Sequence, residues 1–104
     1  MRSLISILDF SAEEIKALVN TAKDIAEHPE AYREKCKYKK LATAFFEPST
    51  RTRLSFEAAM LELGGSVLGF SDANSSSAAK GESMVDTARV LSCYADILAI
   101  RHPR

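Results

Sequence analysis

The chain has 104 residues, of which 46% are apolar and 27% charged, and this balance is typical of a soluble globular protein with one small domain. Its 14 basic and 14 acidic side chains cancel, which argues against a general nucleic-acid or membrane-surface role. No apolar stretch reaches the roughly 20 residues of a membrane span, and the N-terminus lacks the cleavage site of a signal peptide.

The first predicted element is a helix that begins after Ser11. Glu14 follows three residues later and completes an S-x-x-E capping box. Apolar residues then recur at helical spacing until His28 and Pro29 end the helix. The predicted apolar face consists of Ile15, Leu18, Val19, Ala22, Ile25 and Ala26.

The second predicted element is a strand over residues 41–46, which follows a polar and basic stretch. Its unbroken apolar run, with two phenylalanines at the end, favours a strand that is buried on both faces. Pro48 stops this strand, and a helical pattern runs over residues 50–63. The following pair Gly64-Gly65 predicts a glycine C-cap for that helix.

Two further strands are predicted over residues 66–70 and 96–100, separated by a polar loop over 71–81 and a helix over 83–95. One side of that helix carries Met84, Ala88, Leu91 and Ala95. Alternating strands and helices predict an α/β fold with a parallel sheet. Three strands make a thin domain, and the chain stops just past the third strand. We therefore expect the first part of a larger α/β protein.

Polar residues follow each predicted strand at its carboxyl end, where open parallel sheets bind ligands. Residues 49–53 follow the first strand, a serine-rich loop with Lys80 follows the second, and Arg101 follows the third. We expect these three positions to converge in space. The order of the strands across the sheet is not contained in the sequence pattern.

The strongest candidate for a binding site is the start of the second helix. Backbone N–H groups there have no intrahelical partners, and the helix dipole adds positive charge. Three hydroxyls and one guanidinium add further donors, a set that suits a phosphate dianion better than a carboxylate. These residues are Ser49, Thr50, Arg51 and Thr52. The simpler alternative is that Ser49 or Thr50 only caps the helix. The pattern is neither a P-loop nor a GxGxxG turn.

The other polar residues near the strand ends have open roles. Lys80 is either a solvated side chain or part of a mobile arm that reaches a bound anion. Arg101 directly follows an apolar strand, so its position suits the crevice. His102 serves equally well as a structural residue or an acid–base group, and Glu47 and Asp72 can orient arginines.

The two cysteines, Cys36 and Cys93, have neither metal-ligand spacing nor a CxxC pattern. Free thiols in a reducing cytoplasm are the preferred interpretation over a disulfide or a metal site.

Three stretches, FFEPSTRTRLSFE, LGGSVLGFSDANSSSAAKGES and ILAIRHPR, resemble the amino-terminal part of the aspartate/ornithine carbamoyltransferase family, and the resemblance covers all 104 residues. It implies a three-layer αβα parallel sheet, the first part of a carbamoyl-phosphate-binding domain. It also implies that the carbamoyl group passes from carbamoyl phosphate to L-aspartate, giving N-carbamoyl-L-aspartate and phosphate in pyrimidine biosynthesis. No metal or organic cofactor is implied.

The same resemblance assigns roles by position. Arg101 matches an arginine that reaches the phosphate and the carbamoyl oxygen, and Glu47 resembles a residue that holds two domains closed. Ser76 and Lys80 match loop residues that enter the active site of a neighbouring subunit, which implies a homotrimer with shared sites. Whether regulatory subunits attach stays open. The implied carbamoyl-phosphate ligands are Ser49, Thr50, Arg51, Thr52, Ser76, Lys80 and Arg101, with catalysis assigned to Arg51, Thr52, Lys80 and Arg101.

Catalysis would rest on positioning and charge stabilisation, without a covalent nucleophile. The family's later HPxQ-type motif and its acceptor domain lie beyond Arg104, so we expect the 104 residues alone to be inactive. Two alternatives stay open: an ornithine or other amine acceptor, and a non-catalytic phosphate-binding or subunit-interaction module. The lysine of SSSAAKGES and the F-E-P before STRTR favour aspartate over ornithine.

Overall fold

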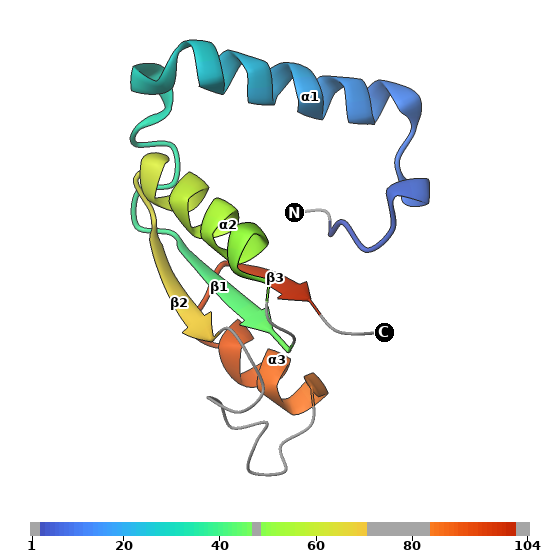
Figure 1. The fold of residues 1–104 in the computed structure, drawn as a ribbon, viewed down its shortest axis with the longest axis vertical. Helices are drawn as coiled ribbons and strands as arrows, with labels where there is room; N and C mark the ends of the chain where they lie inside the picture. Colours follow the sequence, from blue (N-terminus) through green and yellow to red (C-terminus); the bar gives the residue numbers. More distant parts are fainter. Residues whose placement is uncertain (1–2, 47–48, 71–83, 102–104) are drawn as a thin grey trace. The chain divides into compact units, whose positions relative to one another are not determined.

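The computed structural model describes residues 3–46, 49–70 and 84–101 (Figure 1). Contacts divide the chain into two compact units, residues 1–32 and residues 33–104. Each unit is described by itself.

The first unit contains a long helix between two short 3-10 helices. Helix α1 spans Ala12–Glu27, and the 3-10 helices η1 and η2 span Ile7–Asp9 and Pro29–Tyr32. The predicted capping box is confirmed, because Glu14 N donates to Ser11 Oγ at 3.1 Å and Ser11 N donates to Glu14 Oε1 at 2.8 Å. Both 3-10 helices went unpredicted, since each is too short for a helical pattern to repeat within it.

The predicted apolar face of α1 is not buried in the described structure. Leu18 and Val19 are 54% and 47% exposed, and no residue of α1 is buried. The physical reason is that α1 is the only long element of its unit, so its apolar side has no sheet or helix within that unit to cover it.

The carboxyl-terminal end of α1 is closed by hydrogen bonds to Asp24. His28 N donates to the backbone oxygen of Asp24 at 2.8 Å, and His28 Nδ1 lies 3.1 Å from Asp24 Oδ1. The Tyr32 hydroxyl donates to the other carboxylate oxygen. This hydroxyl, and then His28, hold the pKa of Asp24 below its ordinary value, while donating the bond to Asp24 raises the pKa of Tyr32.

The second unit is built on a three-stranded parallel sheet. Its strands are β1 (Lys40–Phe45), β2 (Ser66–Phe70) and β3 (Ile97–Arg101), in the order β2-β1-β3. The predicted parallel α/β sheet is therefore confirmed. The first strand along the chain is the central one.

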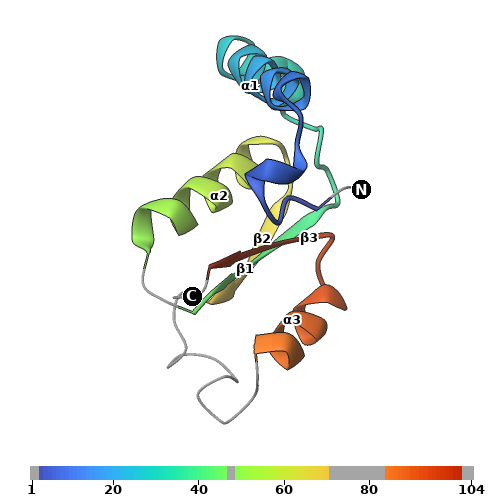
Figure 2. The ribbon, with the colours of Figure 1, turned by 90° about the vertical axis from the view of Figure 1, so that its right-hand side faces the viewer.

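Helices cover both faces of this sheet. Helix α2 (Thr50–Glu62) packs on β1 and β2, whereas α3 (Met84–Ser92) packs on β1 and β3. Seen along the edge of the sheet, the two helices lie on opposite faces (Figure 2). The three-layer αβα arrangement is confirmed for the second unit.

The core is centred on β1. Its residues from Leu41 to Phe45 are all buried, and Thr43 is 0% exposed. Met60 of α2 adds to this core from one face. The prediction of a strand buried on both faces is confirmed, because β1 has a strand on each side and a helix over each face.

The end of α2 is a glycine cap, as predicted. Gly64 N donates to Leu61 O at 3.1 Å and Gly65 N donates to Met60 O at 3.0 Å, the pair of bonds that defines a Schellman motif. Gly64 has φ +90°, and a Cβ at this position would lie 2.2 Å from the backbone oxygen of Arg33. Only glycine fits here without a backbone shift.

Two predicted boundaries near β3 shift in the structure. Helix α3 ends at Ser92 rather than at residue 95, because the chain tightens into a turn in which Tyr94 N donates to Leu91 O at 3.0 Å. Strand β3 begins at Ile97 rather than at residue 96 and extends to include Arg101.

Asp96 joins the beginning of β3 to the beginning of β1 by two hydrogen bonds. Lys40 N donates to Asp96 Oδ2 at 2.9 Å, and Asp96 N donates to Lys40 O at 2.9 Å. The strands then run in register from Leu41 opposite Ile97 to Phe45 opposite Arg101.

Candidate functional site

The carboxyl ends of all three strands meet at one edge of the sheet. Ala44 of β1 pairs with Phe70 of β2 on one side and with Ile100 of β3 on the other. Phe45 pairs with Arg101, and Phe46 N then donates to Arg101 O at 2.8 Å. The predicted convergence of the three strand ends is confirmed for this backbone.

The connections at this edge leave in opposite directions. After β1 the chain reaches α2 on one face of the sheet, and after β2 it reaches α3 on the other face (Figure 2). By the general rule for open α/β sheets, a reversal of this kind between neighbouring strands places the ligand-binding crevice outside their carboxyl ends.

The start of α2 borders this crevice. Ser49 is the N-cap residue, with φ −157°, and its backbone oxygen accepts from Arg53 N at 3.0 Å. Its side chain makes no capping hydrogen bond. The simpler interpretation, in which the Ser49 hydroxyl is present to cap the helix, is therefore not supported by the structure.

The predicted site side chains near the crevice differ in exposure. Thr50 and Arg51 are exposed, and Ser49 and Thr52 are half-buried. Arg101 is exposed at the last position of β3. An exposed guanidinium at the start of α2 and another at the end of β3 thus belong to neighbouring segments of the same sheet edge. Their roles stay predictions.

Several predicted residues lie outside the described part of the chain. These are Glu47, Asp72, Ser76, Lys80 and His102. Their assignments also stay predictions.

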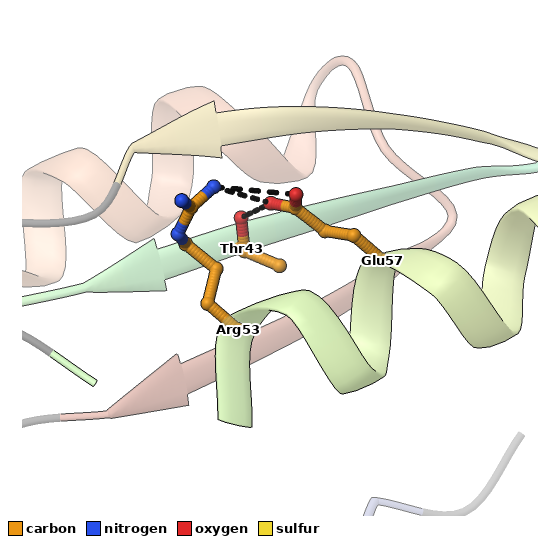
Figure 3. Close-up of polar contacts among 3 residues, drawn as sticks. All are labelled: Thr43, Arg53 and Glu57. Carbon is orange, nitrogen blue, oxygen red and sulfur yellow. Dashed lines mark hydrogen bonds and ion pairs between the residues drawn. The ribbon is translucent and has the colours of Figure 1, made fainter. Parts of the chain in front are cut away.

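Sequence reasoning missed a polar cluster directly beneath the start of α2. Arg53 Nη1 lies 3.2 Å from Glu57 Oε1 and 3.3 Å from Oε2, and Thr43 Oγ1 donates to Glu57 Oε2 at 3.0 Å. In Figure 3 the Arg53 and Glu57 side chains leave α2 and meet Thr43 on β1. Two features of the sequence point to it: Arg53 and Glu57 have the i, i+4 spacing of a helical ion pair, and Thr43 is the one hydroxyl side chain in the strand before them.

This cluster is shielded from solvent more than a surface ion pair. The side chains of Arg53 and Glu57 are 28% and 18% exposed, and Thr43 is 0% exposed. Arg53 Nε is buried and has no hydrogen-bond partner among the described residues. The two arginines of STRTR are therefore in different environments, one exposed and one held against the sheet.

Two other kinds of feature are absent from the described residues. No helix among them is long and apolar enough to cross a membrane. Within the same residues, no three His, Cys, Asp or Glu side chains gather as they would around a metal ion. Both described thiols, Cys36 and Cys93, are free.

Comparison with known proteins identifies close relatives. The chain is 64% identical over 104 residues to the aspartate carbamoyltransferase catalytic subunit of Lachnoclostridium phytofermentans, and 59% identical over 103 residues to that of Clostridium novyi. It covers 100% and 99% of its own length in these matches, but only 34% of each relative. The chain thus spans about a third of the length of these relatives.

Solved structures agree with this result. The catalytic subunit of M. jannaschii aspartate transcarbamoylase superimposes with a TM-score of 0.89 at 50% identity, over 100% of this chain and 35% of that chain. Aspartate transcarbamoylase from Trypanosoma cruzi, in complex with carbamoyl phosphate and aspartate, has a TM-score of 0.88 at 40% identity, over 99% of this chain and 34% of that chain.

The family described as aspartate/ornithine carbamoyltransferase, carbamoyl-P binding domain, matches residues 2–104. This match confirms the resemblance seen in the sequence motifs. The chain belongs to the aspartate/ornithine carbamoyltransferase family.

Proposed function

We propose that the chain is the carbamoyl-phosphate-binding part of an aspartate carbamoyltransferase catalytic subunit. The complete protein would transfer the carbamoyl group from carbamoyl phosphate to L-aspartate, giving N-carbamoyl-L-aspartate and phosphate, an early step of pyrimidine biosynthesis. One observation carries the proposal. The start of α2, whose N-cap hydroxyl makes no capping bond, follows a strand whose end pairs with the end of β3, in a chain 64% identical over 104 residues to such a subunit.

The proposed ligands of carbamoyl phosphate begin with the first turn of α2. Backbone donors there, and the hydroxyls of Ser49, Thr50 and Thr52, would hold the phosphate oxygens. The guanidinium of Arg51 would grip two of those oxygens at once. This assignment is supported by the exposure of Arg51 and by the absence of a side-chain cap on the helix.

Arg101 would complete the site from the neighbouring strand, reaching both the phosphate and the carbamoyl oxygen. During attack by the amino group of aspartate, negative charge grows on the carbonyl oxygen and on the departing phosphate. Fixed cations aimed at these atoms lower the barrier electrostatically. The chain supplies these charges together with the positioning of the reactant, and no side chain needs to form a covalent intermediate.

The proposal includes a homotrimer, in which Ser76 and Lys80 reach the active site of a neighbouring subunit. It includes a cytoplasmic location, supported by the two free thiols of the described residues. It does not require regulatory subunits. Residues 1–104 would form the amino-terminal carbamoyl-phosphate-binding part, with aspartate bound elsewhere in the complete protein, so the 104 residues alone should form no carbamoyl aspartate.

The direct test uses the full-length protein that carries this chain. Labelled carbamoyl phosphate is supplied with L-aspartate, L-ornithine or no acceptor, and the carbamoylated product is separated and counted. We expect product with aspartate at a rate at least about 100-fold above the rate with ornithine, since a site built for the carboxylate side chain of aspartate strongly rejects the oppositely charged ammonium of ornithine. Equal rates, or product only with ornithine, would reject the proposed acceptor.

A binding measurement separates the enzyme from a non-catalytic module. Calorimetric titration with carbamoyl phosphate should give saturable binding, and a bisubstrate analogue that joins the phosphonate and aspartate groups should bind more tightly. Binding of phosphate without any product from either amino acid would instead favour a phosphate-binding or subunit-interaction module.

A further inference from the structure

We propose that Thr43, Arg53 and Glu57 form a positioning cluster that holds the first turn of α2 at a fixed place against β1. None of these side chains is assigned to the ligand. Their role would be to position the side chains and backbone donors that are assigned to the ligand. This inference rests on the proposed function, because its effect is read through the affinity for carbamoyl phosphate.

Arg51 and Arg53 lie on different sides of α2. Residues two positions apart on a helix are separated by about 200° around its axis, so Arg51 and Arg53 cannot serve the same side of α2. Their exposures agree with this geometry, because Arg51 is exposed whereas the Arg53 side chain is only 28% exposed. Arg53 meets Glu57 on the side of α2 that contacts the sheet (Figure 3). The second arginine of STRTR therefore has a different task from the first.

The three side chains link α2 to β1. Arg53 binds Glu57 within α2, and Glu57 accepts a hydrogen bond from Thr43, which lies in the centre of β1. This chain of contacts joins the helix to the strand on either side of the β1–α2 connection. The same connection leads to Ser49 and the start of α2. A helix that slides or rotates on the sheet would break these bonds first.

The partly buried charges of the cluster carry a free-energy cost. Apolar side chains could cover this part of β1 without desolvating a carboxylate and a guanidinium, whose partial burial costs free energy. Polar contacts have strict requirements for distance and angle, whereas apolar packing has few. A cluster that is more than two-thirds buried therefore fixes the orientation of α2 at some cost in stability. A misplacement of about 1 Å can cost a site about 100-fold in rate.

The test uses a matched pair of substitutions at one buried position in the full-length protein. Thr43→Val keeps the shape of the side chain but removes the hydroxyl, whereas Thr43→Ser keeps the hydroxyl but removes a methyl group. Both lower the melting temperature. We expect only Thr43→Val to raise the Kd for carbamoyl phosphate, by about tenfold, while Thr43→Ser stays within about twofold of the unaltered protein.

A second pair keeps the test decisive if a buried substitution prevents folding. Arg53→Ala should raise the Kd for carbamoyl phosphate by about 30-fold, and Arg53→Lys should restore part of this loss because it retains the charge but not the planar fork. Glu57→Gln, at the middle of the cluster, should raise the Kd by an amount between those of the two Arg53 variants. Arg89→Ala, in the last turn of α3, is the matched control and should leave the Kd unchanged.

The outcomes distinguish the two proposals. If Thr43→Val and Thr43→Ser, or Arg53→Ala and Arg53→Lys, lose stability yet bind carbamoyl phosphate like the unaltered protein, the cluster is merely structural and the inference is wrong. If the unaltered protein binds carbamoyl phosphate but carbamoylates no aspartate, the proposed function fails while the pattern of Kd values still decides the inference. An unaltered protein that binds no carbamoyl phosphate overturns both.

Discussion

The beginnings of α1 and α2 show two ways to treat the unpaired donors of a helix. At α1, Ser11 and Glu14 exchange two hydrogen bonds with each other's backbone, so the helix satisfies its own N-terminus. At α2, the N-cap is again a serine, yet the side chain of Ser49 makes no such bond. The same residue type thus closes one helix end with its side chain and leaves the other without a side-chain cap. The difference lies in the third following residue, which is Glu14 in α1 and Thr52 in α2.

The largest expected effect is that of replacing Arg51 at the start of α2, the proposed ligand-binding end. In the full-length protein, Arg51→Ala should lower kcat/KM for carbamoyl phosphate by about 100- to 1000-fold, since it removes a bidentate charged donor from a developing dianion. Steady-state kinetics with L-aspartate in excess measures this. Arg89→Ala removes the same charge from the end of α3 and should leave kcat/KM within about twofold. A small effect of Arg51→Ala would remove the contrast between the two helix ends.

The next effect compares how the two helices end. Gly64→Ala should lower the free energy of unfolding by at least about 2 kcal/mol, because alanine is strained at φ +90° and its Cβ would meet Arg33 O at 2.2 Å. His28→Ala, at the end of α1 where φ is −131°, should cost about 0.5 kcal/mol or less. Urea denaturation measures both. Equal costs would show that the backbone at Gly64 relaxes.

A smaller effect is expected from replacing the two N-cap serines, Ser11 and Ser49. Ser11→Ala should cost about 1 kcal/mol of stability and leave the Kd for carbamoyl phosphate unchanged, because it breaks a cap. Ser49→Ala should cost less than about 0.5 kcal/mol but raise that Kd about tenfold, because it removes a donor to a charged ligand. Denaturation and calorimetry on the same two samples give the result. A loss of stability without a change in Kd for Ser49→Ala would make it an ordinary cap.

The smallest effect concerns the exposed end of α1. The bond from the Tyr32 hydroxyl lowers the pKa of Asp24, so the stability it contributes is present above the ordinary pKa, near 4, and is lost as pH falls through the lowered value. Tyr32→Phe should raise the pKa of Asp24 toward its ordinary value, as followed by NMR titration of the Asp24 carboxyl. Tyr38→Phe, which alters an exposed tyrosine packed on Lys37, should leave it unchanged.

Local signals in the sequence predicted those parts of the fold that depend on neighbouring residues. The capping box at Ser11 and the glycine cap at Gly64 each involve a few consecutive residues, and both are confirmed. The burial of β1 followed from an unbroken apolar run. The order β2-β1-β3 could not be predicted, because it depends on which side of β1 each crossover takes.

In the candidate site too, features that depend on neighbouring residues could be predicted, and features that depend on packing could not. The proposed phosphate-binding role of the start of α2 rests on residues that are consecutive in sequence, so it could be predicted without the structure. The contact of Glu57 with Thr43 joins residues from two packed elements, and only the packing of α2 on β1 brings them together. For that reason the sequence assigned Arg53 no role, and only the structure places its side chain against the sheet.

The paired hydrogen bonds between Lys40 and Asp96 have a consequence at the far end of the sheet. They determine which residue of β1 faces each residue of β3, and Arg101 reaches the level of Phe45 only in that alignment. Each strand residue advances about 3.3 Å and alternates between faces, so a slip by a single position would withdraw the guanidinium and turn it to the other side. A carboxylate about five residues away thus decides whether an arginine arrives at the crevice, and β3 serves as a spacer of defined length.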